Sequence, residues 1–398
     1  MLISTKIRII PTPEQETLFW KAAGAARWAY NSYLGVNETL YKTSEATEYQ
    51  KSISESAYRK LINGVKKTMY PWLYEISNNV FKQAVKDAAM ARERWFKGIA
   101  EKPKFKKKYK TKPSFYLNYE SLRKTPAGFK GEKLGEVKLS YPLPKLPKDI
   151  KHYSNPRITY DDKYWYLSVG YPVKERQVQL TDAIIGIDLG IKELAVLSNG
   201  KVYPNINKTK RVRLLKKRLR RQKRCRSRRF EHNVKERINN RPVYKRPLRD
   251  CKNYQRQSQR IRNTERTLFN IRTNYLHQTT TEIVKTKPFT VVLEDLNVRG
   301  MMKNKHLSSA ISEQKLYEFR RQIEYKCKLY GIKAMIADRW YPSSKTCSNC
   351  GYHKDNLKLS ERTYYCPVCG LNIDRDLNAA INLAKLPNAT GEVKPTES

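Results

Sequence analysis

The spacing of apolar residues predicts a strand and then helices in the first hundred residues. The opening segment TKIRII alternates polar and apolar residues, as a half-buried strand does. Thr12, Pro13 and Gln15 follow it and form a helix-start signal of the capping-box type. Between about residues 45 and 100, apolar residues recur at helical spacing, which is typical of the packed core of a helical lobe.

The pattern then changes to short strands. Residues 103–110, PKFKKKYK, form a basic connector. Beyond it, apolar and aromatic runs are broken by Pro and Gly, as in short β-strands. Helices inserted between an early strand and these later strands predict a small β-barrel interrupted by a helical lobe. The expected strands lie near residues 114–118, 135–141, 156–160 and 164–171.

A third pattern begins at Ala183. The segment IIGIDL is an almost wholly apolar strand, LAVLS is a second, and SNGK predicts the turn to a third. The next strand of similar strength, FTVVLEDL, begins only at residue 289, and a basic insertion fills the gap.

The insertion carries 14 Lys or Arg among the 22 residues 208–229. Such a run is often only a solvated face or a flexible arm. Leu214, Leu215 and Leu219 lie at helical spacing within it, however, and favour a helix with one packed edge and one phosphate-facing side.

The amino-acid composition indicates which class of partner the protein binds. The 398 residues are enough for two or more domains, and 81 Lys and Arg against 37 Asp and Glu give a net charge of +44, which predicts a polyanionic partner. The 27 tyrosines suit base stacking, so nucleic acid is favoured over a membrane surface or an acidic protein. No membrane partner is expected, because no apolar run approaches a span and the opening residues lack a signal peptide.

Two strands end in acidic residues. Asp188 closes IIGID and Glu294 closes TVVLE, each among apolar neighbours, so burying either carboxylate is costly unless its charge is compensated. A divalent cation such as Mg²⁺ is the natural compensation. Asp295 must point to the opposite side of an extended strand from Glu294, and spacing alone does not decide which of the two faces the site.

A third acid is expected at a helix start. The segment DRDLNAAINLA predicts a helix that begins close to Asp374 and Asp376. An Asp at such a position is more often only an N-cap. Together with the two strand acids, however, it is similar to the RNase H-like nuclease arrangement, in which a sheet and an adjoining helix hold two metal ions about 4 Å apart.

Four of the seven cysteines predict a structural zinc site. They form two CxxC pairs separated by 15 residues, and a Gly follows each pair, as the turns of a zinc ribbon require. Four thiolates leave no open position for catalysis. A redox role for the CxxC pairs is the alternative, but no thioredoxin-like context surrounds them. Since four cysteines are already available as ligands, His353 is better explained as a surface or nucleic-acid contact. The predicted ligands are Cys347, Cys350, Cys366 and Cys369.

Several segments resemble one family. GIDLGIKELAVLSNG, VVLEDLNVRGM, WYPSSKTCSNCG and YYCPVCGLNIDRDLNAAINL resemble, in order and spacing, the RuvC motifs and zinc ribbon of TnpB proteins, and KIRIIPTPEQ and RWAYNSYL resemble their opening segment. The resemblance implies that Asp188, Glu294 and Asp376 are the three catalytic, Mg²⁺-binding acids. It makes Asp295 and Asp374 supporting residues.

The resemblance also implies a multidomain α+β fold. A small wedge-like β-barrel with an inserted helical recognition lobe would precede an RNase H-like RuvC α/β domain that carries the zinc ribbon. The expected boundaries are 1–40 and 111–180 for the barrel, 41–110 for the lobe, 181–386 for the RuvC domain, about 206–283 for its basic helical insertion, about 341–372 for the ribbon and 387–398 for a flexible tail.

The implied activity is RNA-guided cleavage of double-stranded DNA beside a short element-adjacent motif. The guide RNA would be transcribed from the element's end, with Mg²⁺, replaceable by Mn²⁺, and one structural Zn²⁺ as cofactors and no need for a protein oligomer. The seven-cysteine pattern fits a reducing cytosol, so we expect a cytoplasmic, nucleoid-associated bacterial or archaeal protein. The expected nucleic-acid contacts on the basic helix are Lys216, Lys217, Arg220, Arg221, Lys223 and Arg224.

Three other functions stay open on the sequence alone. A miniature type V CRISPR effector shares the architecture and the chemistry. An RNA-guided repressor would bind without cutting, although the intact acids disfavour it. A junction resolvase needs no guide, and it leaves the helical amino-terminal half and the large positive charge without a role.

Overall fold

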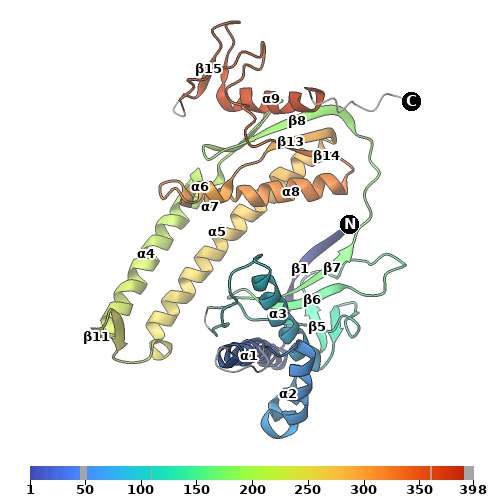
Figure 1. Cartoon of the computed structure of the whole chain (residues 1–398), viewed down its shortest axis with the longest axis vertical. Helices are drawn as coiled ribbons and strands as arrows, with labels where there is room; N and C mark the ends of the chain where they lie inside the picture. The colour runs from blue at the N-terminus through green and yellow to red at the C-terminus, as the bar shows by residue number, and fades with distance from the viewer. Residues whose placement is uncertain (45–51, 109, 359–360, 390–398) are drawn as a thin grey trace. The chain divides into compact units, whose positions relative to one another are not determined.

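A computed structural model describes residues 1–44, 52–108, 110–358 and 361–389. The chain divides into two compact units, Met1–Val173 and Lys174–Ser398 (Figure 1). Among the described residues, no helix is both long enough and apolar enough to cross a membrane.

The first unit is a seven-stranded sheet with a helical insertion. The strand order is β2-β6-β7-β1-β5-β4-β3, and β1 pairs antiparallel with both β7 and β5. Three α-helices and one short 3-10 helix lie between β1 and β2 in sequence. The strands are β1 (Leu2–Ile10), β2 (Ser114–Tyr116), β3 (Arg123–Lys124), β4 (Gly128–Gly131), β5 (Gly135–Leu139), β6 (Ser154–Tyr160) and β7 (Trp165–Pro172). The helices are α1 (Pro13–Ser44), α2 (Glu55–Met69), η1 (Pro71–Glu75) and α3 (Asn78–Phe96).

Aromatic side chains join the helices of this unit to its sheet. Phe19 of α1 meets Trp165 of β7 edge to face, with ring centroids 5.3 Å apart, and Phe115 of β2 lies 5.8 Å from Phe19. All three are buried, and Ile7 and Ile9 of β1 extend the same core. The alternation read from the opening segment is therefore that of a strand with one buried face.

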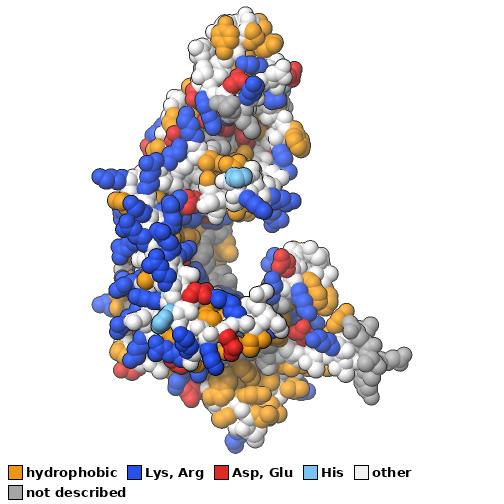
Figure 2. All heavy atoms as spheres, turned by 90° about the vertical axis from the view of Figure 1, so that its left-hand side faces the viewer, with side chains coloured by type: hydrophobic (Ala, Val, Ile, Leu, Met, Phe, Trp, Pro, Cys, Tyr) orange, Lys and Arg blue, Asp and Glu red, His pale blue; other side chains and the backbone are white. Residues whose placement is uncertain are grey.

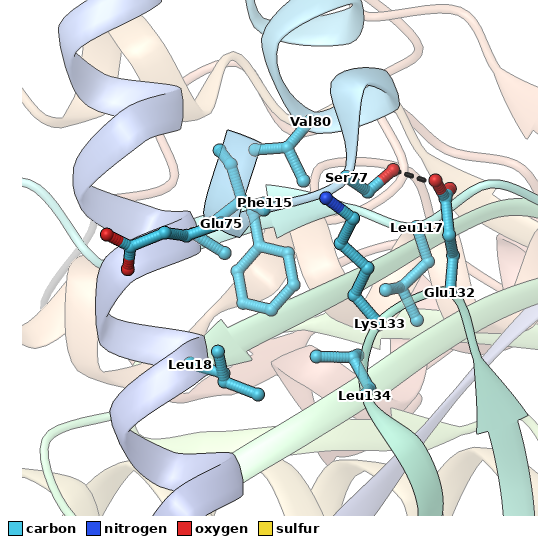
Figure 3. Close-up of a pocket in the computed structure, with 11 residues that line it drawn as sticks. Leu18, Glu75, Ser77, Val80, Phe115, Leu117, Glu132, Lys133 and Leu134 are labelled. Carbon is cyan, nitrogen blue, oxygen red and sulfur yellow. Dashed lines mark hydrogen bonds between the residues drawn. The ribbon is translucent and has the colours of Figure 1, made fainter. Parts of the chain in front are cut away.

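The turn between β4 and β5 anchors the helical insertion. Glu132 accepts hydrogen bonds from Ser77 Oγ at 2.6 Å and from Asn79 Nδ2 at 3.3 Å, so a carboxylate lies at the amino terminus of α3, where the helix dipole favours it (Figure 3). Lys133 Nζ donates to the carbonyl oxygen of Tyr74 in η1. Leu134 then closes the small apolar cavity between α1 and the sheet.

The predictions made from the sequence for this unit have different outcomes. The helical pattern predicted from about residue 45 is found in α2, η1 and α3, whereas residues 45–51 lie outside the described residues. The strands β3 and β4 had not been expected. Closure of the sheet into a barrel stays a prediction, because among the described residues β2 and β3 are end strands without a shared hydrogen-bonded ladder.

The second unit contains a five-stranded mixed sheet. Its order is β10-β9-β8-β13-β14, with β8, β13 and β14 parallel and β9 antiparallel to β8. Its strands are β8 (Thr181–Leu189), β9 (Glu193–Leu197), β10 (Val202–Pro204), β13 (Pro288–Glu294) and β14 (Lys333–Ala337). Two separate two-stranded sheets are formed by β11 (Val234–Ile238) and β12 (Arg241–Tyr244), and by β15 (Thr363–Tyr365) and β16 (Asn372–Asp374). Its helices are η2 (Ile206–Lys208), α4 (Lys210–Asn233), η3 (Leu248–Asp250), α5 (Lys252–Lys285), α6 (Val298–Met301), α7 (Ser308–Gln314), α8 (Leu316–Leu329) and α9 (Arg375–Ala389).

Helices cover both faces of this sheet, which explains the continuous apolar runs of its parallel strands. Ile187 and Leu293 belong to a core cluster with Leu276 of α5 and Phe319 of α8. On the opposite face, Val292 packs with Leu383 of α9. Figure 1 shows α9 on one side of β8 and β13 and α8 on the other. Helix α9 continues to Ala389, so the first residues of the expected flexible tail, 387–389, are helical, and 390–398 lie outside the described residues.

Gly186 lets α9 approach β8 more closely than any other residue would. A Cβ at this position would lie 2.0 Å from the carbonyl oxygen of Ala380 and 2.6 Å from the amide nitrogen of Ala384. Residues two apart in a strand lie on the same face, so the Asp188 side chain lies on the face of the sheet where a Cβ of residue 186 would stand, which is the face that α9 covers. The glycine therefore seats α9 beside the carboxylate that follows it.

Replacing Gly186 with Ala should destabilise the second unit. The new Cβ would overlap the backbone of α9, so we expect the free energy of unfolding to fall by at least about 1–3 kcal/mol, measured by calorimetry or denaturant titration. Gly64→Ala in α2 is the matched control, because a Cβ there meets nothing within 4 Å and should stabilise the helix by about 0.5–1 kcal/mol. Equal stability of G186A and wild type would contradict the packing.

Candidate active site and metal centre

Asp188 and Glu294 end neighbouring parallel strands. Leu293 of β13 lies beside Ile187 of β8, so the next step of the same register brings Glu294 beside Asp188. Both side chains are half-buried at the carboxyl edge of the sheet. The two strand acids predicted from the sequence are thus brought together.

Asp376 lies in the first turn of α9, one helical turn before Ala380, which meets Gly186. Its side chain is 16% exposed. The capping role belongs to Asp374, whose Oδ1 accepts from the amide nitrogens of Asp376 at 2.9 Å and Leu377 at 3.1 Å. Asp376 therefore does not cap α9, and its Oδ1 lies 3.8 Å from Arg375 and 3.9 Å from Arg362.

The three acids interact electrostatically. Burial, and then the charges of Glu294 and Asp376, raise the pKa of Asp188 well above its usual value. Burial also raises the pKa of Glu294, and Asp376 adds to the shift, although a hydrogen bond from Ser343 opposes it. Carboxylates crowded in this way need a compensating positive charge.

The donor set fits a divalent cation that keeps water and phosphate among its ligands. Across the described ranges, the four cysteines are the sole group of three or more His, Cys, Asp or Glu whose ligand atoms all lie within 4.8 Å. The oxygens of Asp188, Glu294 and Asp376 therefore do not all lie within 4.8 Å of one another.

Asp295 points away from the acids and is held by two arginines. Its Oδ1 lies 2.6 Å from Arg320 of α8 and its Oδ2 lies 2.5 Å from Arg339, which follows β14. Hydrogen bonds from these guanidinium groups lower the pKa of Asp295. Glu294 and not Asp295 therefore belongs to the acidic site, and Asp295 fixes the loop that follows β14.

A cleft of about 290 Å³ is lined by both Glu294 and Asp295 and also includes Arg339, Tyr341 and Ser343. Ser343 donates to Glu294 Oε1 at 2.5 Å. Sequence reasoning did not single out Ser343 or the two arginines, although WYPSSKTCSNCG contains the serine and places it after a strand. Trp340 of the same loop is 85% exposed.

The four cysteines converge as a tetrahedral thiolate site does. Cys347 Sγ lies 3.6 Å from Cys369 Sγ, and Cys350 Sγ lies 3.5 Å from Cys366 Sγ. Four thiolates at about 2.3 Å from one zinc ion would lie about 3.8 Å apart. The glycine after each pair has positive φ, +79° at residue 351 and +73° at residue 370, and each donates its amide hydrogen to the first cysteine of its pair. The geometry fits structural zinc.

Buried amides on α9 tie the acidic site to the cysteine ribbon. Asn378 accepts from the amide nitrogen of Ser348 at 2.9 Å and donates to the carbonyl of Thr346 at 2.7 Å. Asn382 donates to the carbonyls of Thr346 at 2.6 Å and Ser343 at 2.8 Å. Both amides are buried, so the helix that carries Asp376 and the segment that enters the ribbon are joined as one piece.

The basic insertion forms a hairpin of long helices, α4 and α5, and Figure 2 shows Lys and Arg side chains gathered on the side where α4 lies. The packed edge of α4 differs from the predicted one, because Leu214 is 57% exposed. The observed edge consists of buried Val212 and Gln222, with Leu215 and Leu219 half-buried.

The six predicted nucleic-acid contacts on α4 fall into two groups. Lys216 Nζ lies 2.6 Å from Glu313, and Lys223 Nζ lies 2.7 Å from Glu265, so these two lysines are held in ion pairs. The other four side chains are exposed: Lys217, Arg220, Arg221 and Arg224.

Three family models match parts of the chain. Residues 1–46 match a "Helix-turn-helix domain", residues 166–305 a "Probable transposase" and residues 317–383 a "Cas12f1-like, TNB domain". In this chain, residues 1–44 form a strand and one long helix.

Two curated relatives match over nearly the whole chain, and both are provisionally named RNA-guided DNA endonucleases. The protein from Streptomyces pristinaespiralis is 28% identical over 95% of this chain and 87% of its own length. InsQ of Escherichia coli K12 is 26% identical over 95% of this chain and 90% of its own. Among solved structures, Cas12f1 in a complex with sgRNA and target DNA is similar in fold, with a TM-score of 0.54, 14% identity and coverage of 96% of this chain and 98% of that one.

The fold and site define a basic, two-unit α/β protein that carries a four-cysteine centre beside a cluster of acids. The matches to transposon-associated models, relatives and Cas12f1 agree with this arrangement. In sequence and fold the chain is similar to proteins of the TnpB family.

Replacing Asp188 with Asn should stabilise the protein when no divalent cation is added. The pKa of Asp188 is higher in the folded than in the unfolded state, so its ionisation opposes folding, and the effect grows as the pH rises above the unfolded value of about 3.9. We expect D188N to raise the free energy of unfolding by about 1 kcal/mol or more at neutral pH, and to have no effect near pH 4, in thermal melts.

Added Mg²⁺ reverses this order if the acids bind it. Millimolar Mg²⁺ should raise the melting temperature of wild type and leave that of D188N nearly unchanged, since a ligand stabilises only the state that binds it. A D188N protein less stable than wild type at neutral pH without Mg²⁺ would contradict the electrostatic argument.

Replacing Asn382 with Ala should loosen the ribbon from α9. The substitution removes the donor of the Ser343 carbonyl and leaves the Thr346 carbonyl with only the one from Asn378. We therefore expect a loss of about 1–3 kcal/mol in stability and faster hydrogen exchange in residues 343–348. Zinc content, measured by elemental analysis, should stay at one ion per chain. The exposed Asn199→Ala serves as the control, and unchanged exchange in N382A would refute the coupling.

Proposed function

We propose that this chain is an RNA-guided DNA endonuclease, and that its five-stranded sheet is the core of an RNase H-like RuvC domain. The observation that carries the proposal is the convergence of Asp188, Glu294 and Asp376 at one sheet edge, in a chain with a net charge of +44. The names of the two full-length relatives support RNA guidance. The strand order β10-β9-β8-β13-β14, with its mixed orientations, supports the RuvC assignment.

The reaction is hydrolysis of a DNA phosphodiester, and each residue has a distinct part in it. Asp188, Glu294 and Asp376 would hold Mg²⁺, which when bound activates water and stabilises the departing 3′ oxygen. Ser343 donates a hydrogen bond to Glu294 and so fixes the direction of its second oxygen. The amides of Asn378 and Asn382 hold α9 against the ribbon, so Asp376 keeps its place as the strand is cut.

The remaining parts receive the roles that the family resemblance implies. Residues 1–40 and 111–180 would form the wedge-like barrel, 41–110 the recognition lobe and 181–386 the RuvC domain with the basic insertion and the ribbon. Exposed Lys217, Arg220, Arg221 and Arg224 on α4 are proposed to contact phosphates of guide RNA or target DNA. The guide is proposed to come from the element's end, with base pairing supplying sequence specificity.

A miniature type V CRISPR effector is the second candidate, because the Cas12f1 fold covers 96% of this chain. Co-purified RNA separates the two origins. The protein is expressed with its native flanking DNA, and its bound RNA is sequenced. A transcript from the element's end supports the transposon origin, whereas repeat-spacer RNA supports the CRISPR origin.

Cleavage is tested with the complex of protein and RNA on plasmids that carry a guide-matched site beside randomised sequence, with Mg²⁺ present. Cutting only at matched sites beside one enriched motif supports the proposal. Guide-matched binding without cutting would indicate a repressor, and cutting that ignores the RNA would indicate a structure-specific nuclease.

Replacing Glu294 with Gln should abolish cutting and preserve binding. Loss of one metal-binding carboxylate removes several kcal/mol of transition-state stabilisation, so we expect cleavage to slow by at least about 10³-fold. Affinity for guide-matched DNA should change by less than about twofold, measured by filter binding. Glu282→Gln, which breaks a surface pair with Lys201, is the matched control and should cut normally. Rapid cleavage by E294Q would exclude this site.

A further inference from the structure

The helical part of the first unit contains a groove that the proposed chemistry does not use. Its volume is about 480 Å³, and it lies between α1, α3 and the connector that follows α3. We name it the aromatic groove and define it by Arg92, Trp95, Phe96, Lys102, Lys104 and Phe105.

Hydrogen bonds fix the walls of the aromatic groove. Asn31 of α1 accepts from the backbone amide of Lys106 at 2.7 Å and donates to its carbonyl at 2.8 Å, so the connector is held against α1. Asn37, which is fully buried, accepts from Arg92 and from the amide nitrogen of Ile53. The groove is therefore built into the lobe and does not depend on loose side chains.

The floor of the aromatic groove offers flat rings with cations beside them. Phe96 is 60% exposed and Phe105 is 48% exposed, so a ligand that covered these rings would remove apolar surface from water. The Arg92 guanidinium lies 5.4 Å from the centre of the Phe96 ring, and Lys102 Nζ lies 5.7 Å from that of Trp95. Rings and cations thus occupy the same surface.

The charge of the groove is strongly positive. Four cations line it, Arg92, Lys102, Lys104 and Lys107, against one carboxylate, Glu38, which lies 3.2 Å from Lys102. Outside the lining, Glu101 lies 3.4 Å from Lys104 in an exposed pair, which contributes little. The ligand must therefore combine a flat apolar face with negative charge. A nucleotide has both, since its base stacks on aromatic rings and its phosphate pairs with Lys and Arg.

We propose that the aromatic groove binds an unpaired nucleotide, with its base on Phe96 and Phe105 and its phosphate at Arg92 and Lys104. The inference rests on the proposed function only in taking nucleic acid as the partner, because it involves none of the three acids. Guide RNA and single-stranded target DNA share this chemistry.

The test measures binding of the full-length protein to fluorescent single-stranded oligonucleotides, rU and dT of equal length, without Mg²⁺ and over a range of salt concentrations. Phe105→Ala should weaken binding by about 5- to 150-fold at every salt concentration, because stacking does not release counterions. Lys104→Gln should instead lower the slope of log K against log salt by about 0.7. Tyr141→Ala, a 72% exposed ring outside the groove, is the matched control and should bind as wild type does.

An abasic oligonucleotide completes the test. It should bind wild type and F105A equally, since it has no base to stack. The oligonucleotide that loses affinity in F105A, rU or dT, identifies the source of the nucleotide. Two outcomes would overturn the groove proposal while the nuclease proposal stands. In the first, wild type binds the oligonucleotides and F105A and Phe96→Ala bind them with the same affinity as Y141A. In the second, an acidic peptide displaces the oligonucleotide as well as an unlabelled oligonucleotide does. If wild type binds neither oligonucleotide, the groove proposal is overturned, and the cleavage test on plasmids decides the nuclease proposal independently.

Discussion

The contact between α9 and β8 at Gly186 is the constraint on which the second unit depends. A helix normally rests on a sheet through a layer of side chains, but here the backbone of Ala380 and Ala384 occupies the space where a Cβ would stand. The helix is thereby placed at one height and in one rotation above the strand. At this one position no side chain separates the two backbones, which brings the first turn of α9, with Asp376, close to the edge where Asp188 and Glu294 end.

The contact also explains why the four-cysteine ribbon lies next to the acidic cluster. The ribbon separates β14 from α9 in sequence, so its folding decides where α9 begins. Asn378 and Asn382 bind the backbone of the segment that enters the ribbon, and a core residue of the ribbon, Tyr364, is fully buried with its hydroxyl bonded to the carbonyls of Lys345 and Tyr352. Zinc binding would therefore be coupled to the geometry of the acids, although the two centres have separate ligands.

Crowding of the acids has a cost that the surrounding structure partly offsets. Burial and mutual repulsion raise the pKa of Asp188 and Glu294, whereas Ser343 favours the charged form of Glu294. Asp295, one residue away, is compensated by Arg320 and Arg339 and has a lowered pKa. Adjacent carboxylates with pKa values shifted in opposite directions show how one strand end separates an acid of the three-residue cluster from an acid held in ion pairs.

The sequence by itself determined the kinds of element and the chemistry. Periodicity located the strands that carry Asp188 and Glu294, and CxxC spacing located the thiolate centre, because both signals are local. Spacing left open whether Glu294 or Asp295 faces the site, and the family resemblance named Glu294 and Asp376. Only the tertiary structure shows that Arg320 holds Asp295, that Asp374 caps α9, that Glu313 holds Lys216 and that Leu214 is exposed. Each of these depends on a partner distant in the chain, such as Ser343, Arg320 or Glu313, and periodicity carries no information about such partners. The aromatic groove escaped sequence reasoning for the same reason, since α1, α3 and the connector meet only in the folded lobe.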